Sequence, residues 1–528
     1  MKILISDKMS EEGIAFLEKQ QGFQVVNRPG MSVDELLEEV ADASALLVRS
    51  KTKVTADVLA AAPKLKAVGR AGAGVDNIDL KEATRRGVVV MNTPGGNSIS
   101  VAEHTLALML ALARKIHEAD SSMKAGQWNK SQLMGQELHG KTLGVVGLGK
   151  IGALVAQLAK SFGMKVTAYD PFISEQFAAD KGIELRDFEE VLQVADFVTL
   201  HLPVNDDTKG LINTQTLGFM KPSAFLINAA RGPLINEDDL ITALETGGLA
   251  GAALDVFNNE PNPDPRLMST GKVVATPHIA GSTREAQVKV GYGIAQQVAD
   301  YLLHNIIRNA VNFPSVSSAE MEKLRPYLEL GERLGAIIGR VCGIRFSEIG
   351  VRYYGELGKL NTKPITSRIV HAVLRPNLTE EVNDINARDR AAERGIEVIE
   401  TVSSRSRSYS NLISIQLRNV DQTEWIEGAI LHQGNLHLVS IDGIGVEAPL
   451  GNHLLFIRND DKPGVVGHVG TILGDAGVNI ASFVLGRGGG QPHAIGVLNV
   501  DSSPSKEVLE KIRQIPAVRF AQAIEFPG

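Results

Sequence analysis

The feature that most constrains this chain is a glycine-rich turn between an apolar strand and a helix. Gly147, Gly149 and Gly152 follow the apolar segment 142–146 and open a segment of helical periodicity at 151–162. The first glycine allows a tight turn, the second lets the backbone approach a pyrophosphate, and the third lets helix and strand pack closely. The free N–H groups of the helix N-terminus favour phosphate. The segment predicts a dinucleotide-binding βαβ unit; the alternative is a glycine turn in an α/β domain that binds nothing.

An acid at the end of the next strand indicates which dinucleotide is bound. Asp170 ends the strand expected at 165–169, and Pro171 and Phe172 follow it. A carboxylate there accepts hydrogen bonds from the adenosine ribose, whereas NADP would need a cation for its 2′-phosphate. NAD is therefore the predicted cofactor. The residues expected around it are Gly147, Gly149, Lys150, Ile151, Gly152 and Asp170.

Strands and helices alternate on both sides of this turn. Residues 1–90 show the pattern, and a second series shows it again up to 275, after a long helix expected from Val101 to about Ala125. Such alternation predicts two doubly wound, parallel-sheet, Rossmann-like domains. The rhythm breaks after a helix at 284–304, and a linker is expected at 314–318.

The remaining chain has two different patterns. Residues 319–449 mix helices with strands expected at 346–354, 411–417 and 425–430, which predicts an α/β domain. The segments after 451 follow the order βαββαβ of a ferredoxin-like domain. The fold class expected for the whole chain is α/β.

Composition excludes several classes of protein. Of 528 residues, 44% are hydrophobic and 22% are charged, which excludes a fibrous or largely disordered chain. The net charge is −7 without a basic block, so nucleic acid is not an expected partner. The single cysteine, Cys342, excludes an intramolecular disulfide, and no Cys/His spacing predicts a metal site. Without a signal peptide or a long apolar run, we expect a cytoplasmic protein that does not bind a membrane.

Polar side chains follow three later strands. Arg231 follows the strand at 225–228, Asp255 and Glu260 follow 251–254, and His278 follows 273–275. Taken one at a time, these residues have ordinary structural explanations: an arginine in a solvated loop, acids that cap helices and a histidine in a turn. Ligands of open α/β sheets bind where these strands end, so the joint placement predicts chemistry. Oxidation of a 2-hydroxy acid needs a base such as His278 and an acid such as Glu260 to hold it. Arg231 can bind the substrate carboxylate bidentately.

At these motifs the sequence resembles the D-isomer-specific 2-hydroxyacid dehydrogenases, along the whole chain. The segments that carry the resemblance are 48–50, 52–55, 69–72, 74–79, 92–98, 126–128, 147–152, 228–232, 253–257 and 276–278. Gly69–Gly72 with Val75–Asn77 is similar to the phosphoglycerate branch. The resemblance implies NAD-dependent oxidation of D-3-phosphoglycerate to 3-phosphohydroxypyruvate, the first step of the phosphorylated route to L-serine.

The resemblance also implies roles and domain boundaries. Arg231, Glu260 and His278 would be catalytic, and Asp255 would face the nicotinamide carboxamide. The substrate would be held by Arg49, Ser50, Arg70, the backbone of Gly74 and, from across a dimer interface, Lys130. The substrate-binding domain would comprise 1–96 and 284–313, around an NAD-binding domain at 97–283.

The carboxyl-terminal half resembles the long form of this branch. This resemblance implies an intervening regulatory domain at 315–450, an ACT domain at 451–528 and a homotetramer. The residues expected to bind an effector, L-serine, are Asn459, Asp461 and Asn479. The segment Val382–Arg390 departs from the family by its added charges, and the basic loop 404–410 is either an anion site or a solvated loop.

Two other functions stay open at this point. One is an NAD-dependent dehydrogenase of another D-2-hydroxy acid. The other is a non-catalytic NAD-sensing protein, because such proteins share this fold and often retain the catalytic residues. The paired arginines Arg49 and Arg70 and the ACT domain favour metabolism.

Overall fold

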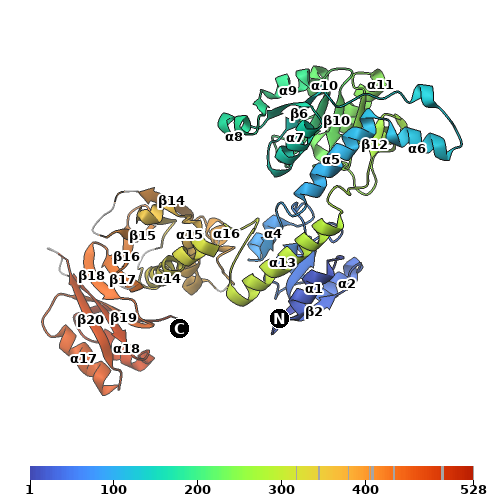
Figure 1. The fold of residues 1–528 in the computed structure, drawn as a ribbon. Coiled ribbons are helices and arrows are strands. Elements are labelled where there is room, and N and C mark those ends of the chain that lie inside the picture. Colours follow the sequence, from blue (N-terminus) through green and yellow to red (C-terminus); the bar gives the residue numbers. More distant parts are fainter. Residues whose placement is uncertain are drawn as a thin grey trace.

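A computed structural model describes residues 1–316, 318–342, 345–378, 380–403, 405, 409–431, 434–488 and 493–526. Figure 1 shows four sheets, two in the amino-terminal half of the chain and two in the carboxyl-terminal half. No helix among the described residues combines the length and the apolar character needed to cross a membrane.

The first sheet has five parallel strands. Its elements are β1 (Lys2–Ile5), α1 (Glu11–Glu18), β2 (Gln24–Asn27), α2 (Val33–Val40), β3 (Ala43–Val48), α3 (Ala56–Ala60), β4 (Ala67–Arg70), α4 (Leu80–Arg85) and β5 (Val89–Met91). The strand order is β2-β1-β3-β4-β5. Helices α2, α3 and α4 pack on one face of this sheet.

The other face is covered by residues from far along the chain. Helix α13 (Arg284–His304) packs Val290, Ile294 and Val298 against the core of the sheet, beside α1. After it, the Asn312 side chain accepts a hydrogen bond from Val90 N at 2.9 Å and donates one to Val88 O at 2.8 Å. The first domain is therefore completed by a segment that follows the second.

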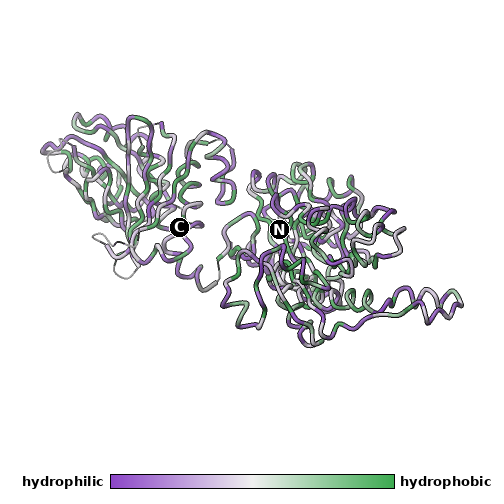
Figure 2. Tube along the Cα trace, turned by 90° about the horizontal axis from the view of Figure 1, so that it is seen from above, coloured by the Kyte–Doolittle hydropathy of each residue, from purple (hydrophilic) through white to green (hydrophobic). Residues whose placement is uncertain are grey.

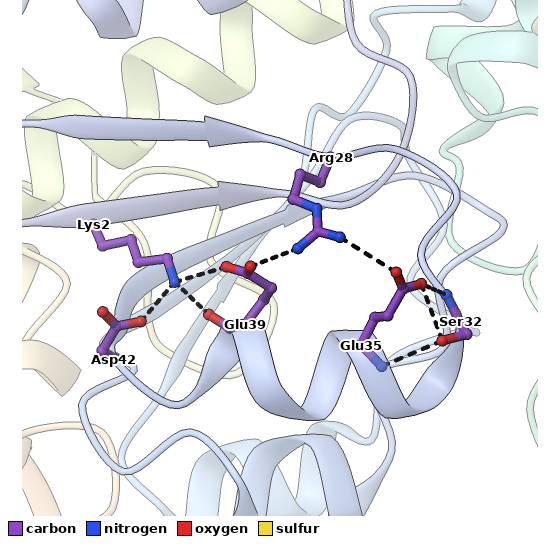
Figure 3. Close-up of polar contacts among 6 residues, drawn as sticks. All are labelled: Lys2, Arg28, Ser32, Glu35, Glu39 and Asp42. Carbon is purple, nitrogen blue, oxygen red and sulfur yellow. Dashed lines mark hydrogen bonds and ion pairs between the residues drawn. The ribbon is translucent and has the colours of Figure 1, made fainter.

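A surface network holds α2 at the edge of this sheet (Figure 3). Lys2 Nζ lies 3.0 Å from Glu39 Oε2 and 2.6 Å from Asp42 Oδ1, and Arg28 bridges Glu35 and Glu39. Ser32 and Glu35 form a capping box at the start of α2. Surface ion pairs contribute little stability each, so the network mainly fixes the position of the helix.

The second sheet has seven parallel strands. Its elements are α5 (Ser98–Ala113), α6 (Ile116–Lys124), η1 (Lys130–Gln132), β6 (Thr142–Val146), α7 (Lys150–Ser161), β7 (Lys165–Tyr169), α8 (Glu175–Asp180), β8 (Glu184–Leu185), α9 (Phe188–Val194), β9 (Phe197–Leu200), α10 (Thr214–Phe219), β10 (Phe225–Asn228), η2 (Gly232–Leu234), α11 (Glu237–Thr246), β11 (Gly251–Leu254), α12 (Pro265–Ser269) and β12 (Val273–Ala275). The order is β12-β11-β10-β9-β6-β7-β8. The direction of winding reverses between β6 and β9, where ligands of such sheets bind.

The helix expected from Val101 to about Ala125 is instead two helices, α5 and α6. Lys115 between them has a φ of +50°, which ends the first helix. Figures 1 and 2 show α6 and η1 projecting away from the sheet. Trp128 and Met134 on this arm are 78% and 82% exposed.

The third sheet has six strands and is mixed. Its elements are α14 (Ser318–Val341), β13 (Glu348–Gly355), η3 (Glu356–Lys359), α15 (Lys363–Leu374), η4 (Arg375–Asn377), α16 (Ala387–Ala392), β14 (Glu397–Ser403), β15 (Asn411–Arg418), β16 (Thr423–Ile430), β17 (Leu436–Ile441) and β18 (Ile444–Pro449). The order is β14-β13-β15-β16-β17-β18, with only β13 and β14 parallel. Helices α14 and α15 pack on one face.

The last sheet confirms the predicted βαββαβ order. Its elements are β19 (His453–Asp460), α17 (Val465–Asp475), β20 (Ile480–Arg487), β21 (His493–Val500), α18 (Lys506–Arg513) and β22 (Val518–Glu525). The strand order is β20-β21-β19-β22, all antiparallel. Arg333 of α14 donates hydrogen bonds to Leu450 O at 2.8 Å and Gly451 O at 2.7 Å, which ties the third domain to the fourth.

Candidate active site

A cleft of about 480 Å³ lies between the first two domains. It is lined by loops that follow strands of both sheets. Among the lining residues are Arg49, Ser50, Arg70, Gly74, Asp76, Ile151, His201, Arg231, Asp255 and His278. The structure thus brings together most of the residues expected to bind substrate with two of the three expected to be catalytic.

The third, Glu260, holds His278. Glu260 Oε2 lies 2.7 Å from His278 Nδ1, and its Oε1 accepts a hydrogen bond from Phe257 N at 3.0 Å. The hydrogen bond to Glu260 raises the pKa of His278, although burial acts against it. For Glu260, burial raises the pKa, but the hydrogen bonds from His278 and Phe257 outweigh it and leave the pKa lowered. This is the arrangement of an oriented general base.

Asp255 holds the loop that carries His278. It is completely buried, and its carboxylate accepts hydrogen bonds from Thr276 Oγ1 at 2.6 Å and from the backbone N–H groups of Ile279 and Ala280, both at 2.8 Å. His278 N also donates to Asp255 O at 2.9 Å. His278 has a φ of +53°, which is uncommon for a non-glycine residue. The hydrogen bonds to Asp255 hold the backbone in this conformation and so fix the imidazole ring at the cleft. The expected contact of Asp255 with a nicotinamide carboxamide stays a prediction.

Three arginines give the cleft a positive charge: Arg49 and Arg70 from the first domain and Arg231 from the second. Burial lowers the pKa of Arg70 to about 10, and the neighbouring charges of Arg231 and Arg49 add to this effect. Burial also lowers the pKa of Arg49. Among the described residues, the buried Nε of Arg70 has no hydrogen-bond partner. A cluster of cations that repel one another is suited to a ligand with more than one negative charge.

Asp76, which sequence reasoning did not single out, is the counter-charge. Its Oδ2 accepts a hydrogen bond from Arg231 Nε at 2.9 Å, across the cleft. A side chain at Gly74 would overlap both Arg231 and Asp76, and one at Gly72 would overlap the Arg70 guanidinium. The absence of side chains at these glycines therefore lets the guanidinium groups approach the loop. The position of an acid beside the glycines after β4 is the signal that could have indicated Asp76.

The glycine turn fits a dinucleotide. Gly147 has a φ of +95°, and a Cβ at Gly152 would collide with Gly147 O. A Cβ at Gly149 would meet no protein atom within 4 Å, so this glycine leaves open space in front of the N-terminus of α7. Asp170 accepts hydrogen bonds from Leu148 N at 2.8 Å and Phe172 N at 2.9 Å, which aim its carboxylate at the turn.

His201 also lines the cleft and was missed by sequence reasoning. Burial lowers its pKa to about 4, so the ring is neutral at physiological pH. Its Nε2 lies 3.0 Å from Thr199 Oγ1. Nothing in the segment Leu200–Pro203 marks this histidine apart from its position at the end of β9.

Other predicted residues lie elsewhere. Lys130, in η1 on the projecting arm, is exposed and is not among the residues that line the cleft. The anion site considered at 404–410 lies largely outside the described residues, which include only 405, 409 and 410 of it. In the part of the chain that the structure describes, no group of three or more His, Cys, Asp or Glu side chains is arranged to hold a metal ion.

No hydrogen bond joins any two of the three predicted effector residues in the described chain. Asp461 Oδ1 lies 3.3 Å from Arg487 Nε, and Asn479 Nδ2 donates to Asp501 Oδ2 at 2.9 Å. Asn459 is buried and, among the described residues, its Oδ1 has no partner.

Comparison with known proteins extends over the whole chain. Three family models match: the NAD-binding domain of D-isomer-specific 2-hydroxyacid dehydrogenases at 106–280, the D-3-phosphoglycerate dehydrogenase intervening domain at 323–442 and the ACT domain at 453–517. The D-3-phosphoglycerate dehydrogenase of Synechocystis sp. is 42% identical over 99% of this chain and 94% of its own length, and that of Bacillus subtilis is 39% identical over 100% of both. A solved protein from Thermus thermophilus matches 59% of this chain and 100% of its own, with 33% identity and a TM-score of 0.55.

Proposed function

Because the chain belongs to the D-3-phosphoglycerate dehydrogenases, in the long form with intervening and ACT domains, we propose that its cleft oxidises D-3-phosphoglycerate to 3-phosphohydroxypyruvate with NAD. One observation carries the assignment of residues. The His278–Glu260 pair and the three guanidinium groups of Arg49, Arg70 and Arg231 belong to the same cleft. A base beside several cations fits a 2-hydroxy acid with a second anionic group.

The proton and the charges of the substrate are handled by this chain. Arg231 binds the substrate carboxylate, which replaces Asp76 as the partner of its guanidinium group. His278, neutral when it acts, accepts the hydroxyl proton at Nε2, and Glu260 stabilises the imidazolium that forms. Arg49 and Arg70 hold the phosphate. As the O–H and C–H bonds break, the carbon–oxygen double bond forms.

The cofactor fits the glycine turn and Asp170. NAD, when bound, supplies the acceptor for the hydride that leaves the substrate carbon. The N-terminus of α7 and the open space at Gly149 would hold its pyrophosphate, and Asp170 would hold its ribose. The carboxylate repels a 2′-phosphate, which selects NAD over NADP.

Formation of NADH by the purified protein tests the function. Incubation with NAD and D-3-phosphoglycerate should produce NADH, and kcat/KM should fall strongly when the unphosphorylated acid, D-glycerate, replaces it. Equal kcat/KM for both acids would indicate a dehydrogenase of another D-2-hydroxy acid. If NAD binds but no acid is oxidised, the protein is an NAD-sensing protein instead.

We propose further that L-serine binds the ACT domain as an effector. The N-terminus of α17 follows Gly464 without a side-chain cap, so its N–H groups can receive a carboxylate. Asp461 would bind the ammonium group, and the buried, unpartnered Asn459 Oδ1 can accept a further hydrogen bond. Since Asn479 forms its hydrogen bond with Asp501 and none with these residues, we assign its contribution to a paired subunit.

Calorimetry on the full-length protein tests this effector. L-serine should bind and inhibit, and Asp461→Ala should weaken both effects. The matched control is Asp475→Ala, at the far end of α17. Absence of heat on titration with L-serine would overturn the proposal and leave the domain as an element of assembly.

We also propose that the chain forms a homotetramer in which the projecting arm contacts a neighbouring subunit. The arm exposes Trp128 and Met134, and Lys130 lies between them. Lys130 could then reach the cleft of a second chain. Sedimentation at several protein concentrations should show a stable tetramer, and a monomer would refute the assignment.

A further inference from the structure

The third sheet carries a groove that none of the proposed functions uses. Helices α14 and α15 cover one face of this sheet (Figure 1). The groove is lined by side chains of the other face. Its volume is about 860 Å³, within the range of small-molecule sites. We call it the sheet-face groove and define it by Arg352, Tyr409, Leu412, Trp425, Glu427 and Glu447, which line it.

A contact across the sheet partly closes this groove. The Tyr409 hydroxyl, just before β15, donates a hydrogen bond to Glu447 Oε1 in β18. Strands β16 and β17 lie between these two elements, so the contact spans the floor. Burial raises the pKa of Tyr409 to about 12, and the hydrogen bond to Glu447 adds to it. A flat protein surface cannot reach a floor beneath such a bridge, whereas a small molecule can.

A polar row crosses the floor. Arg352 of β13 is opposite Ser414 of β15, Ser414 is opposite Glu427 of β16, and Glu427 is opposite Ser440 of β17. Ser440 Oγ donates to Glu427 Oε2 at 2.9 Å, which orients the carboxylate. Among the residues that the structure describes, Arg352 forms no ion pair. One cation and one anion thus lie in one row, about 10 Å apart at the backbone because a single strand separates them.

Apolar side chains lie beside this row. Leu412, Ala429 and Val439 form a buried cluster against which Tyr354 and Tyr409 pack. On the opposite side of the row, Trp425 is 38% exposed. The groove therefore joins a pair of opposite charges to an apolar surface.

We propose that the sheet-face groove binds a zwitterionic α-amino acid with a large apolar side chain. The carboxylate of the ligand pairs with Arg352, its ammonium group pairs with Glu427, and its side chain contacts the Leu412 cluster. Two carboxylates, Glu427 and Glu447, disfavour a polyanion, so neither D-3-phosphoglycerate nor a nucleotide fits. The proposal does not depend on the dehydrogenase activity.

Tryptophan fluorescence gives a direct test, because the chain has only two tryptophans, Trp128 and Trp425. In full-length Trp128→Phe protein, the emission reports on the groove alone. Titration with L-phenylalanine or L-leucine should produce a saturable change in this emission. Arg352→Met or Glu427→Gln in that background should weaken binding about 10- to 100-fold. Arg375→Met, in η4 on the helical side of the domain, is the matched control.

Four results would overturn the proposal. The first is an emission that neither amino acid changes, and the second is equal affinity of the variants and of the parent protein for the amino acid. The third is that phenylacetate or phenethylamine, which each lack one of the two charges, binds as tightly as L-phenylalanine. The fourth is self-association of the protein that buries Trp425 and excludes both amino acids. Circular dichroism and thermal melting of the variants show whether they are folded. Since NADH formation is not measured, failure here leaves the proposed dehydrogenase untouched.

Discussion

Replacement of Arg70 by methionine tests how the cleft selects a phosphorylated acid. Methionine keeps much of the length of the side chain and removes its charge. The native group is fully charged near pH 8, since burial lowers its pKa only to about 10. Its buried Nε lacks a partner among the described residues, which leaves hydrogen-bonding capacity for the phosphate.

The expected loss follows from the number of hydrogen bonds removed. A hydrogen bond to a charged group contributes about 1.5–3 kcal/mol, and a guanidinium can make two to a phosphate. Losing both corresponds to about 3–6 kcal/mol, or roughly 10²–10⁴ in kcat/KM. Since D-glycerate has no phosphate, its kcat/KM should change far less.

Initial rates of NADH formation with both acids provide the measurement. The ratio of kcat/KM for D-3-phosphoglycerate to that for D-glycerate should collapse in Arg70→Met. In the wild type this ratio should also fall as the pH rises through about 10, where the Arg70 cation is lost. Arg86→Met, at the half-buried C-cap of α4, is the control. An equal loss for both acids would show that Arg70 maintains the structure and does not read the phosphate.

Three further substitutions test the other assignments. His278→Ala should lower kcat by about 10²–10⁴ while NAD still binds, and near-normal turnover would remove His278 from the mechanism. Because Glu260 raises the pKa of His278, Glu260→Gln should move the acidic limb of the kcat/KM profile to lower pH; an unmoved limb would contradict this. Asp170→Ala should narrow the preference for NAD over NADP, mostly through the KM for NAD, and an unchanged preference would refute the ribose contact. Two glycine substitutions test the turn itself. Gly149→Ala should weaken NAD binding without lowering Tm, whereas Gly152→Ala should lower both the affinity for NAD and Tm. Equal losses of Tm in the two variants would contradict the open space at Gly149.

Periodicity predicted many of the elements, but it did not predict the strands β17 and β18, and it failed where conformation depends on distant contacts. The ACT domain could be predicted because its strands and helices are long and separated by turn residues. The break between α5 and α6 could not, because Lys115 adopts a left-handed conformation where neither glycine nor proline marks a turn. Strand β14 was not predicted, since its residues are only partly buried and lack a clear alternation.

The candidate site divides in the same way. Arg231 and His278 were indicated by their positions after strands, and their placement at one cleft follows from the topology of the sheet. Asp76 was not, because its partner Arg231 belongs to another domain, and the acid beside the glycines after β4 does not by itself identify that partner. Asp255 carries a strong motif, yet its complete burial and its hydrogen bonds to the His278 loop follow only from tertiary structure.

The return of α13 to the first sheet has a consequence for synthesis of the chain. The apolar cluster around Ile3, Ile5 and Val89 is completed only when Val290, Ile294 and Val298 have left the ribosome. At about 5–20 residues per second, roughly 200 residues of the second domain are made first, which takes about 10–40 s. Throughout that time α1 is the helix that covers this face of the parallel sheet, and the part that α13 later covers stays exposed. Nascent chains stalled before α13 should therefore bind chaperones or aggregate, while chains stalled after Asn312 should resist proteolysis.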